Sequence, residues 1–320
     1  MAGDRRALPR GVSPILVGVD TTPLRQTRAG TARYLQGLLA HLDVPVRELS
    51  FPATSRLRSV AADALWYPRL HAEGIELLHC PSFRGPFTPK VPLVVTVHDL
   101  AVLREPGWFN RWTRSYSRFA VPRVVRAASR IIAVSEFTRR ELVDSLGAPE
   151  AKIRVVPNGV DPVFSPEGAR AEGDYALAVG TLEPRKNLAR IAAAVDGELR
   201  VVGAQGWGGV QAPRDVTWLG EVDDEELARL YRGARCLVYA SLYEGFGLPV
   251  AEALACGCPV VTSVGTAMEE IAGPDATYVD PEDVESIRDG IARAFRPTPR
   301  RVASWPDVAA ATRAVYEEVA

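Results

Sequence analysis

No stretch of this sequence approaches the roughly 20 consecutive apolar residues that cross a bilayer. Its first twelve residues, MAGDRRALPRGV, also lack the apolar segment of a secretory signal. Of the 320 residues, 47% are hydrophobic and 24% are charged, which is typical of a globular protein. We therefore expect a cytoplasmic protein with enough residues for two domains.

Cysteine is scarce, and its spacing fits neither a disulfide framework nor a zinc site. Cys80 and Cys236 lie in or beside apolar runs, which predicts a place in the core. Cys256 and Cys258 are separated by one residue, but no second Cys/His pair accompanies them. We expect all four cysteines to be structural.

Two further absences narrow the function. The apolar run 15–20 is followed by TTPLRQTRAG and not by G-x-G-x-x-G, which argues against a nicotinamide-dependent oxidoreductase. The isoelectric point of 6.5 argues against a nucleic-acid-binding protein.

The net charge of −1 conceals a difference between the two halves of the chain: residues 1–165 hold 23 basic and 14 acidic residues, and residues 166–320 hold 15 basic and 25 acidic residues. This asymmetry indicates two domains with different partners.

The sequence does contain a regular alternation of short apolar runs with helical stretches. The predicted strands are 15–20, 75–80, 92–99, 130–135, 175–180, 199–204, 216–220, 236–241 and 259–263, and residues 153–161 are expected to end the first half in a turn. The predicted helices are 30–42, 140–147, 187–195, 224–234, 249–257, 284–296 and 307–319. This alternation indicates two doubly wound α/β domains, 1–165 and 170–304, which face each other across a ligand cleft. Helix 305–320 is expected to pack back on the first domain.

Glu244 and Glu252 flank a turn in YEGFGLPVAEA that is suited to start a helix. Gly245 and Gly247 allow a ligand to approach the backbone closely, and Pro249 suits a first helical turn. The amides of a helix start, together with the helix dipole, favour an anion such as a phosphate. In this interpretation Glu252 accepts hydrogen bonds from a diol such as ribose. The alternative is that Glu252 only suits the dipole and Glu244 is a solvated loop acid.

The segment GTLEPRKN, residues 180–187, directly follows a predicted strand and places Arg185 and Lys186 at the mouth of the same cleft. An arginine fork and a compact lysine charge both suit phosphate oxygens. Since cations oppose the dipole at a helix start, their presence there favours a bound diphosphate over incidental charge. His98, in VVTVHD, follows a buried strand and can contact a substrate or move a proton, although a lone histidine is more often structural.

These segments together resemble the retaining GT-B glycosyltransferases of the E-x7-E family (family 4-like, group 1), which includes bacterial mannosyl- and rhamnosyltransferases of polysaccharide assembly. Glu244 and Glu252 match the E-x7-E motif, and GTLEPRKN is similar to the family's G-T-x-x-x-R-K-N segment. HDLAVL, IIAVSEFTRREL and VVPNGVD are similar to other stretches of the family. The loop QTRAGTARY, residues 26–34, departs from the common G-G-I-G-R-Y form and keeps only Gly30 near the donor phosphate.

The resemblance implies that a hexosyl group, mannose-like or related, moves from a nucleotide-diphosphate sugar with retention of the anomeric configuration. The catalytic residues that it implies are His98, Glu244, Arg185 and Lys186. The donor-binding residues that it implies are Gly30, Gly180, Thr181, Asn187, Val222, Phe246, Gly247, Leu248 and Glu252. Among these, Glu252 is implied to bind the ribose, and Val222 is implied to lie by the base.

The sequence contains no D-x-D triplet, the usual carboxylate pair for a metal ion, so we expect turnover without metal or cofactor. Fixed cations and helix-start amides would stabilise the departing phosphate instead. No carboxylate stands out as a covalent nucleophile, which favours a front-face mechanism in which the phosphate accepts the acceptor's proton. A non-catalytic nucleotide-sugar-binding protein and a sugar-nucleotide epimerase of the same fold stay open as alternatives.

Residues 104–140 contain nine arginines and only two acids, Glu105 and Glu136. The aromatic residues between them are Trp108, Phe109, Trp112, Tyr116 and Phe119. Such a mixture suits an anionic membrane surface or a lipid-linked diphosphate acceptor. The alternative is an amphipathic helix whose aromatics pack on their own domain. The expected acceptor is a saccharide, lipid-linked or small-molecule hydroxyl, and the expected location is cytoplasmic with peripheral membrane contact left open.

Overall fold

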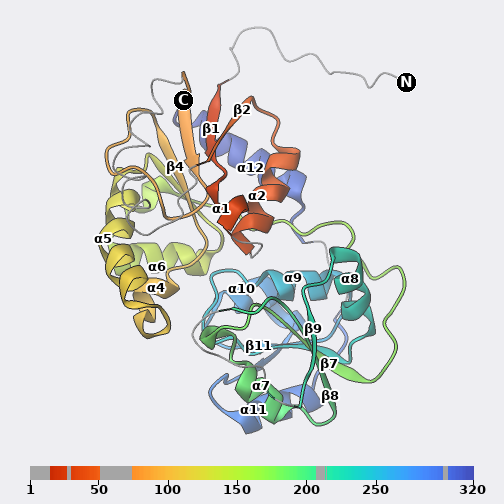
Figure 1. Cartoon of the computed structure of the whole chain (residues 1–320). Coiled ribbons are helices and arrows are strands. Elements are labelled where there is room, and N and C mark those ends of the chain that lie inside the picture. Colours follow the sequence, from red (N-terminus) through yellow and green to blue (C-terminus); the bar gives the residue numbers. More distant parts are fainter. Residues whose placement is uncertain (1–14, 27–29, 51–73, 207–212, 214, 298–301) are drawn as a thin grey trace, which may run out of the picture.

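The computed structural model describes residues 15–26, 30–50, 74–206, 213, 215–297 and 302–320, which form two α/β lobes (Figure 1). Residues 1–14, which include the segment MAGDRRALPRGV, and residues 27–29 of the segment QTRAGTARY lie outside the described residues. Within these described ranges, no helix combines the length and apolarity needed to span a membrane.

The first lobe is built on a six-stranded parallel sheet with the order β2-β1-β3-β4-β5-β6. Its strands are β1 (Val17–Asp20), β2 (Val46–Leu49), β3 (Leu77–Cys80), β4 (Leu93–Val97), β5 (Arg130–Ala133) and β6 (Ile153–Val155). Its described helices include α1 (Thr22–Gln26), α2 (Gly30–His41), α4 (Ala101–Arg104), α5 (Arg111–Ala127) and α6 (Glu136–Leu146).

The sequence predicts the four inner strands of this sheet but neither of its edge strands, β2 and β6. The residues of β2, VREL, include two exposed charged side chains, so this strand lacks the apolar run that marks the buried strands. Strand β6 was missed because residues 153–161 were expected to form a turn. Only Ile153–Val155 are a strand, and the turn-favouring residues Pro157, Asn158 and Gly159 follow it.

The second lobe contains another six-stranded parallel sheet, with the order β12-β11-β10-β7-β8-β9. Its strands are β7 (Tyr175–Val179), β8 (Glu198–Val202), β9 (Thr217–Gly220), β10 (Cys236–Tyr239), β11 (Val260–Ser263) and β12 (Thr277–Val279). Its described helices are α7 (Leu188–Ala194), α8 (Asp224–Gly233), α9 (Leu248–Ala255), α10 (Ala267–Ala272) and α11 (Val284–Ala292). The short elements α10 and β12 were not predicted.

The central strands of both sheets are buried, and the predicted class of two doubly wound α/β units is confirmed. Every residue of β1, β3, β4, β10 and β11 is buried, as a parallel sheet covered on both faces requires. The four cysteines are buried and free, in agreement with a structural role. In the second sheet the strand order reverses between β7 and β10, and ligands of open α/β sheets bind at such a reversal.

The final helix, α12 (Trp305–Glu317), belongs in space to the first lobe, where it packs against α2 (Figure 1). Ser304 caps it, and Asp307 completes a reciprocal capping box. The indole of Trp305 fills the space between two glycines. A Cβ at Gly37 would lie 2.2 Å from its ring, and a Cβ at Gly159 would lie 2.6 Å from it. The helix can dock closely because both neighbours lack a side chain.

We predict that Gly37→Ala lowers the free energy of unfolding by about 1 to 3 kcal/mol, because the added methyl group overlaps the indole of Trp305. Helix propensity alone would favour alanine by about 1 kcal/mol, so a loss identifies the overlap as the cause. Urea denaturation measures the change. The matched control is Gly107→Ala, where the new Cβ meets no atom within 4 Å. Equal stability of Gly37→Ala and wild type would contradict this packing.

Candidate active site

The loops after β7 and β10, which flank the reversal of strand order, carry the two motifs that the sequence singles out. Residues 180–187 follow β7, and residues 240–247 follow β10 and lead into α9. Gly247 adopts a left-handed backbone with φ of 87°, no side chain caps the helix, and Pro249 lies in its first turn. The helix therefore begins at the sheet edge where α/β proteins bind their ligands.

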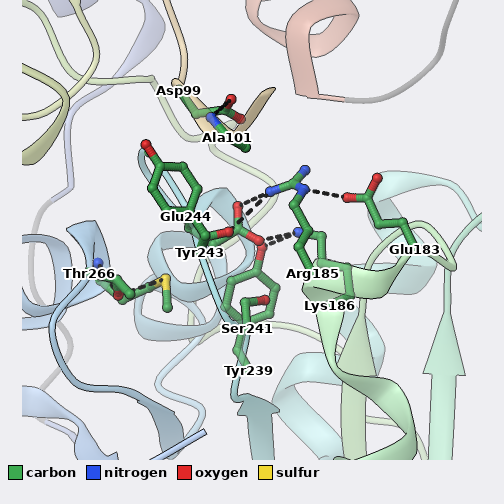
Figure 2. Close-up of polar contacts among 12 residues, drawn as sticks. Asp99, Ala101, Glu183, Arg185, Lys186, Tyr239, Ser241, Tyr243, Glu244 and Thr266 are labelled. Carbon is green, nitrogen blue, oxygen red and sulfur yellow. Dashed lines mark hydrogen bonds and ion pairs between the residues drawn. The ribbon is translucent and has the colours of Figure 1, made fainter. Parts of the chain in front are cut away.

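Glu244, in the loop after β10, lies between two cations of the loop after β7, Arg185 and Lys186 (Figure 2). Its Oε2 is 2.8 Å from Nη1 of Arg185, and its Oε1 is 2.6 Å from Nζ of Lys186. Lys186 also donates to the hydroxyl of Tyr239 at 2.5 Å, and Nε of Arg185 is 2.6 Å from Oε1 of Glu183. All of these side chains are buried or nearly so, so the cluster is a compact network and not a group of solvated loop charges.

The network sets the ionisation of its members. Burial alone would raise the pKa of Glu244, but Arg185 and Lys186 outweigh it and lower that pKa to about 2. Burial lowers the pKa of Lys186, although Glu244 opposes the shift. Burial also raises the pKa of Glu183, with Arg185 opposing. Glu244 is therefore a permanent anion near neutral pH, which makes it unsuited to proton transfer.

Glu252 occupies a different environment, in α9, with its side chain 1% exposed. Its Oε1 is 2.9 Å from Nη1 of Arg33, a residue of α2 in the first lobe, and its Oε2 accepts from the hydroxyl of Tyr231 at 3.1 Å. Burial raises the pKa of Glu252 to about 7, with Arg33 and Tyr231 opposing. The two glutamates thus differ in both partners and ionisation.

His98 follows β4 and reaches this region from the first lobe. Its Nε2 is 3.0 Å from the carbonyl oxygen of Pro81, and the edge-to-face ring of Tyr34 lies 4.9 Å away between centroids. Because a carbonyl only accepts, Nε2 carries the proton in this contact and Nδ1 is left as the acceptor of the neutral ring. Burial lowers the pKa of His98, which favours that neutral form.

The backbones of the two lobes meet at Gly245. A Cβ there would lie 1.8 Å from the carbonyl oxygen of His98. The carbonyl oxygen of Gly245 accepts from Ser135 Oγ at 2.6 Å and from Thr138 Oγ1 at 3.1 Å. Only glycine allows this approach, so the loop that carries Glu244 contacts the loop that carries His98 directly.

Of the remaining predicted donor-binding residues, all but Gly30 lie in the second lobe. Gly180 and Thr181 follow β7, Phe246 is buried, and Leu248 and Val222 are half-buried. Gly30 is exposed at the first position of α2. Asn187 differs from the others, because its side-chain amide donates to the carbonyls of Ala240 and Pro281 at 3.0 and 2.6 Å. This amide therefore joins the loop after β7 to the loop after β10 and to the loop that contains Pro281.

Sequence reasoning missed four participants: Glu183, Arg33, Tyr231 and Tyr239. Glu183 stands within the GTLEPRKN motif and could have been noticed as an acid two positions before Arg185. Arg33 stands within the R-A-G-T-A-R-Y segment, in the first turn of α2. No local pattern marks the two tyrosines, whose hydroxyls reach the site only through the packing of α8 and β10.

In the part of the chain that the structure describes, no group of three His, Cys, Asp or Glu side chains is arranged to hold a metal ion.

Comparison with known sequences shows that each of the two lobes matches a glycosyltransferase family. Residues 7–164 match the family described as Glycosyltransferase Family 4, and residues 209–303 match Glycosyl transferases group 1. O-antigen chain mannosyltransferase B of Escherichia coli is 29% identical over 291 residues, which cover 79% of this chain and 74% of that protein. The MMP alpha-(1->4)-mannosyltransferase of Mycolicibacterium hassiacum is 30% identical over 71% of this chain and 65% of its own length.

Among solved structures, HepE of Anabaena in complex with UDP and glucose superposes with a TM-score of 0.64. The superposition covers 96% of this chain and 95% of that chain at 16% sequence identity. At such low identity the likeness concerns the fold, which is the two-lobed GT-B arrangement.

We predict that Glu244→Gln lowers the free energy of unfolding at pH 7 by about 3 kcal/mol, because Arg185 and Lys186 lose a buried counter-ion. The pKa of Glu244 in the folded protein, about 2, lies below the usual 4.5. Its contribution is therefore complete above pH 4.5 and is lost as the pH falls toward 2. Urea denaturation at pH 7 and pH 4 should show the difference from wild type narrowing.

The control is Glu150→Gln, whose side chain is 68% exposed and pairs with Arg139 at the surface. Its effect should stay within about 0.5 kcal/mol at both pH values. A Glu244→Gln protein as stable as the control would show that the cluster contributes nothing to the fold.

Proposed function

This chain is a glycosyltransferase of the GT-B fold whose first lobe matches Glycosyltransferase Family 4 and whose second lobe matches Glycosyl transferases group 1, and we propose that it transfers a hexosyl group from a nucleoside-diphosphate sugar with retention of configuration. The proposal rests on one observation above all: Arg185 and Lys186 are held by Glu244 beside the start of α9. A helix start and two fixed cations form a suitable site for a diphosphate.

The leaving group explains why such a site would accelerate the reaction. Cleavage of the bond between the sugar and the diphosphate adds negative charge to the departing phosphate. Cations that are already oriented by Glu183 and Glu244 stabilise that charge without reorganising. In this proposal Arg185 and Lys186 take the place of a metal ion, and the reaction needs none.

The sugar end of the donor would lie between the loop of Glu244 and His98, since these two loops meet at Gly245. We propose that His98 accepts a hydrogen bond from a donor-sugar hydroxyl through Nδ1, because Nε2 is occupied by Pro81. Glu244, a permanent anion, would position the sugar and the cations and would not transfer a proton. The departing phosphate would accept the acceptor's proton on the face from which it leaves.

The relatives support a mannose-like hexose as the transferred group, since the two described above are named mannosyltransferases. HepE of Anabaena, whose fold this chain shares, binds UDP and glucose in its structure, which supports a nucleoside diphosphate as the carrier. We propose a saccharide or lipid-linked hydroxyl as the acceptor, in keeping with the O-antigen product named for the Escherichia coli relative.

We further propose that α5 contacts an anionic membrane surface. Its inner face packs into the first lobe through Ala120, Val121, Val124 and Val125. Its exposed residues include Arg111, Arg118, Arg123, Arg126 and Phe119, of which Phe119 is 50% exposed. Arg123 lies 3.6 Å above the ring of Phe119. Basic side chains around an exposed aromatic favour the headgroup region of an anionic bilayer.

The function is tested by incubating the protein with GDP-, UDP- and dTDP-hexoses and a panel of saccharide acceptors, with and without EDTA. We expect NMR of the product to show the donor's anomeric configuration, and EDTA to leave the rate unchanged. Lys186→Met should lower kcat about 100-fold, because one stabiliser of the leaving group is lost. Lys90→Met, at an exposed lysine, is the matched control.

An inverted product would contradict the front-face mechanism. Binding of nucleotide sugars without turnover on any acceptor would favour the non-catalytic alternative.

The membrane proposal predicts that the protein floats with liposomes that contain anionic phospholipid and not with neutral liposomes. Phe119→Ser combined with Arg123→Ser should lower the bound fraction at least threefold, since each surface cation contributes about 1 kcal/mol. Arg288→Ser, on α11 of the second lobe, is the control. Equal binding of the control and the double variant would remove α5 from this role.

A further inference from the structure

Glu252, the carboxylate proposed to hold the donor's ribose, has no oxygen facing open solvent. Its side chain is 1% exposed, with Arg33 at 2.9 Å from Oε1 and Tyr231 at 3.1 Å from Oε2. A ribose diol offers two hydroxyl donors, which need accessible acceptor positions on the carboxylate. Something must therefore move before a ribose can bind there.

The two partners of Glu252 differ in how readily they can move. Tyr231 is fully buried in the core of the second lobe, so its hydroxyl is fixed by packing. Arg33 extends from α2 of the first lobe, and its side chain is 28% exposed. Arg33 is the partner that can leave, because a partly exposed, flexible side chain loses little packing when it turns away.

Arg33 also has other partners available. Its Nη2 is 3.0 Å from Oδ1 of Asp224, whose side chain is 49% exposed, and its guanidinium lies over the ring of Phe164. Arg33 and Glu252 both line a cavity of about 230 Å³ between the lobes, together with Gln36, Asp161 and Asp224. The guanidinium can thus release Glu252 and still remain paired with an acid at the wall of this cavity.

From this geometry we propose that Arg33 is a cover on the ribose carboxylate: it occupies Glu252 in the free protein and competes with the ribose diol of the donor. The inference rests on the proposed function, because it takes a nucleoside diphosphate as the ligand. If Arg33 competes with the diol, this residue of the opposite lobe affects how much more tightly the site binds a nucleotide with a ribose diol than one without it. The discrimination is weakened while Arg33 is present, since the diol must break an ion pair to reach Glu252.

The test measures the dissociation constants of UDP and GDP and of their 2′,3′-dideoxy forms by calorimetry at pH 9. The groups that face Glu252 are Arg33, Tyr231 and Asp224, and pH 9 lies above the pKa of about 7 that Glu252 has in the wild-type protein. Because Arg33 lowers this pKa, its removal raises it, and a second measurement at pH 10 verifies that the ratio in Arg33→Met is that of the ionised carboxylate. The readout is the ratio of the two dissociation constants for each base. A loss of general attraction for phosphate cancels in this ratio, because both forms carry the same diphosphate.

Arg33→Met should raise the preference for the ribose form about fivefold, the effect expected when a partly exposed ion pair of about 1 kcal/mol no longer competes. The gain should vanish when Glu252→Gln is also present, because the diol then loses its carboxylate. Arg313→Met, which removes a surface ion pair with Glu317 on α12, is the matched control and should leave the ratio unchanged. Thermal unfolding verifies that each variant is folded.

An unchanged or reduced ratio in a folded Arg33→Met protein would overturn the cover, and a reduced ratio would make Arg33 a direct contact of the ribose. A gain that persists with Glu252→Gln would also overturn it, since Glu252 would then not be the group uncovered. If the wild-type protein binds none of the four nucleotides, the proposed function is contradicted, and the proposal that Arg33 competes with the ribose fails with it. Wild-type binding without the expected change in Arg33→Met contradicts the cover alone.

Discussion

The burial of two adjacent cations is the constraint on which the site depends. Arg185 and Lys186 lie in a loop with little solvent around them, and removal of charges from water costs several kcal/mol per ion unless partners replace the water. Glu244 and Glu183 are those partners. The position of Glu244 in the loop after β10, and the contact of that loop with the loop after β7, both follow from this need for compensation.

The same constraint explains why the two glutamates of one motif behave differently. Glu244 faces two cations within its own lobe, and its pKa falls to about 2. Glu252 is buried with one arginine from the other lobe and a neutral tyrosine, and its pKa rises to about 7. Glu244 is an anion near neutral pH that orients two cations, whereas the charge of Glu252 in that pH range depends on its surroundings. Contacts across the lobes can therefore act on Glu252 far more than on Glu244.

Much of the fold was predictable from the sequence because parallel strands buried on both faces must be continuously apolar. The predicted strands for which this holds, such as 92–99 and 236–241, correspond to β4 and β10. Strand β2 escaped prediction because an edge position tolerates Arg47 and Glu48. The candidate site was predictable to the extent that its residues stand in strand-end loops with glycine, proline and charge in close sequence. Tyr231, Tyr239 and Arg33 were missed because their roles arise from contacts between elements distant in the chain.

The sequence by itself determined two α/β units, the strand-end loops that carry the charges, and the residue types that can hold a diphosphate. Those properties depend on local periodicity and on spacing within one segment. The tertiary structure decided which charges meet: Arg185 and Lys186 with Glu244, and Arg33 with Glu252. It also decided that Gly245 receives the backbone of His98. The physical reason is that the strength of an ion pair and the pKa of a carboxyl depend on distance and burial, which arise only when the two lobes pack together.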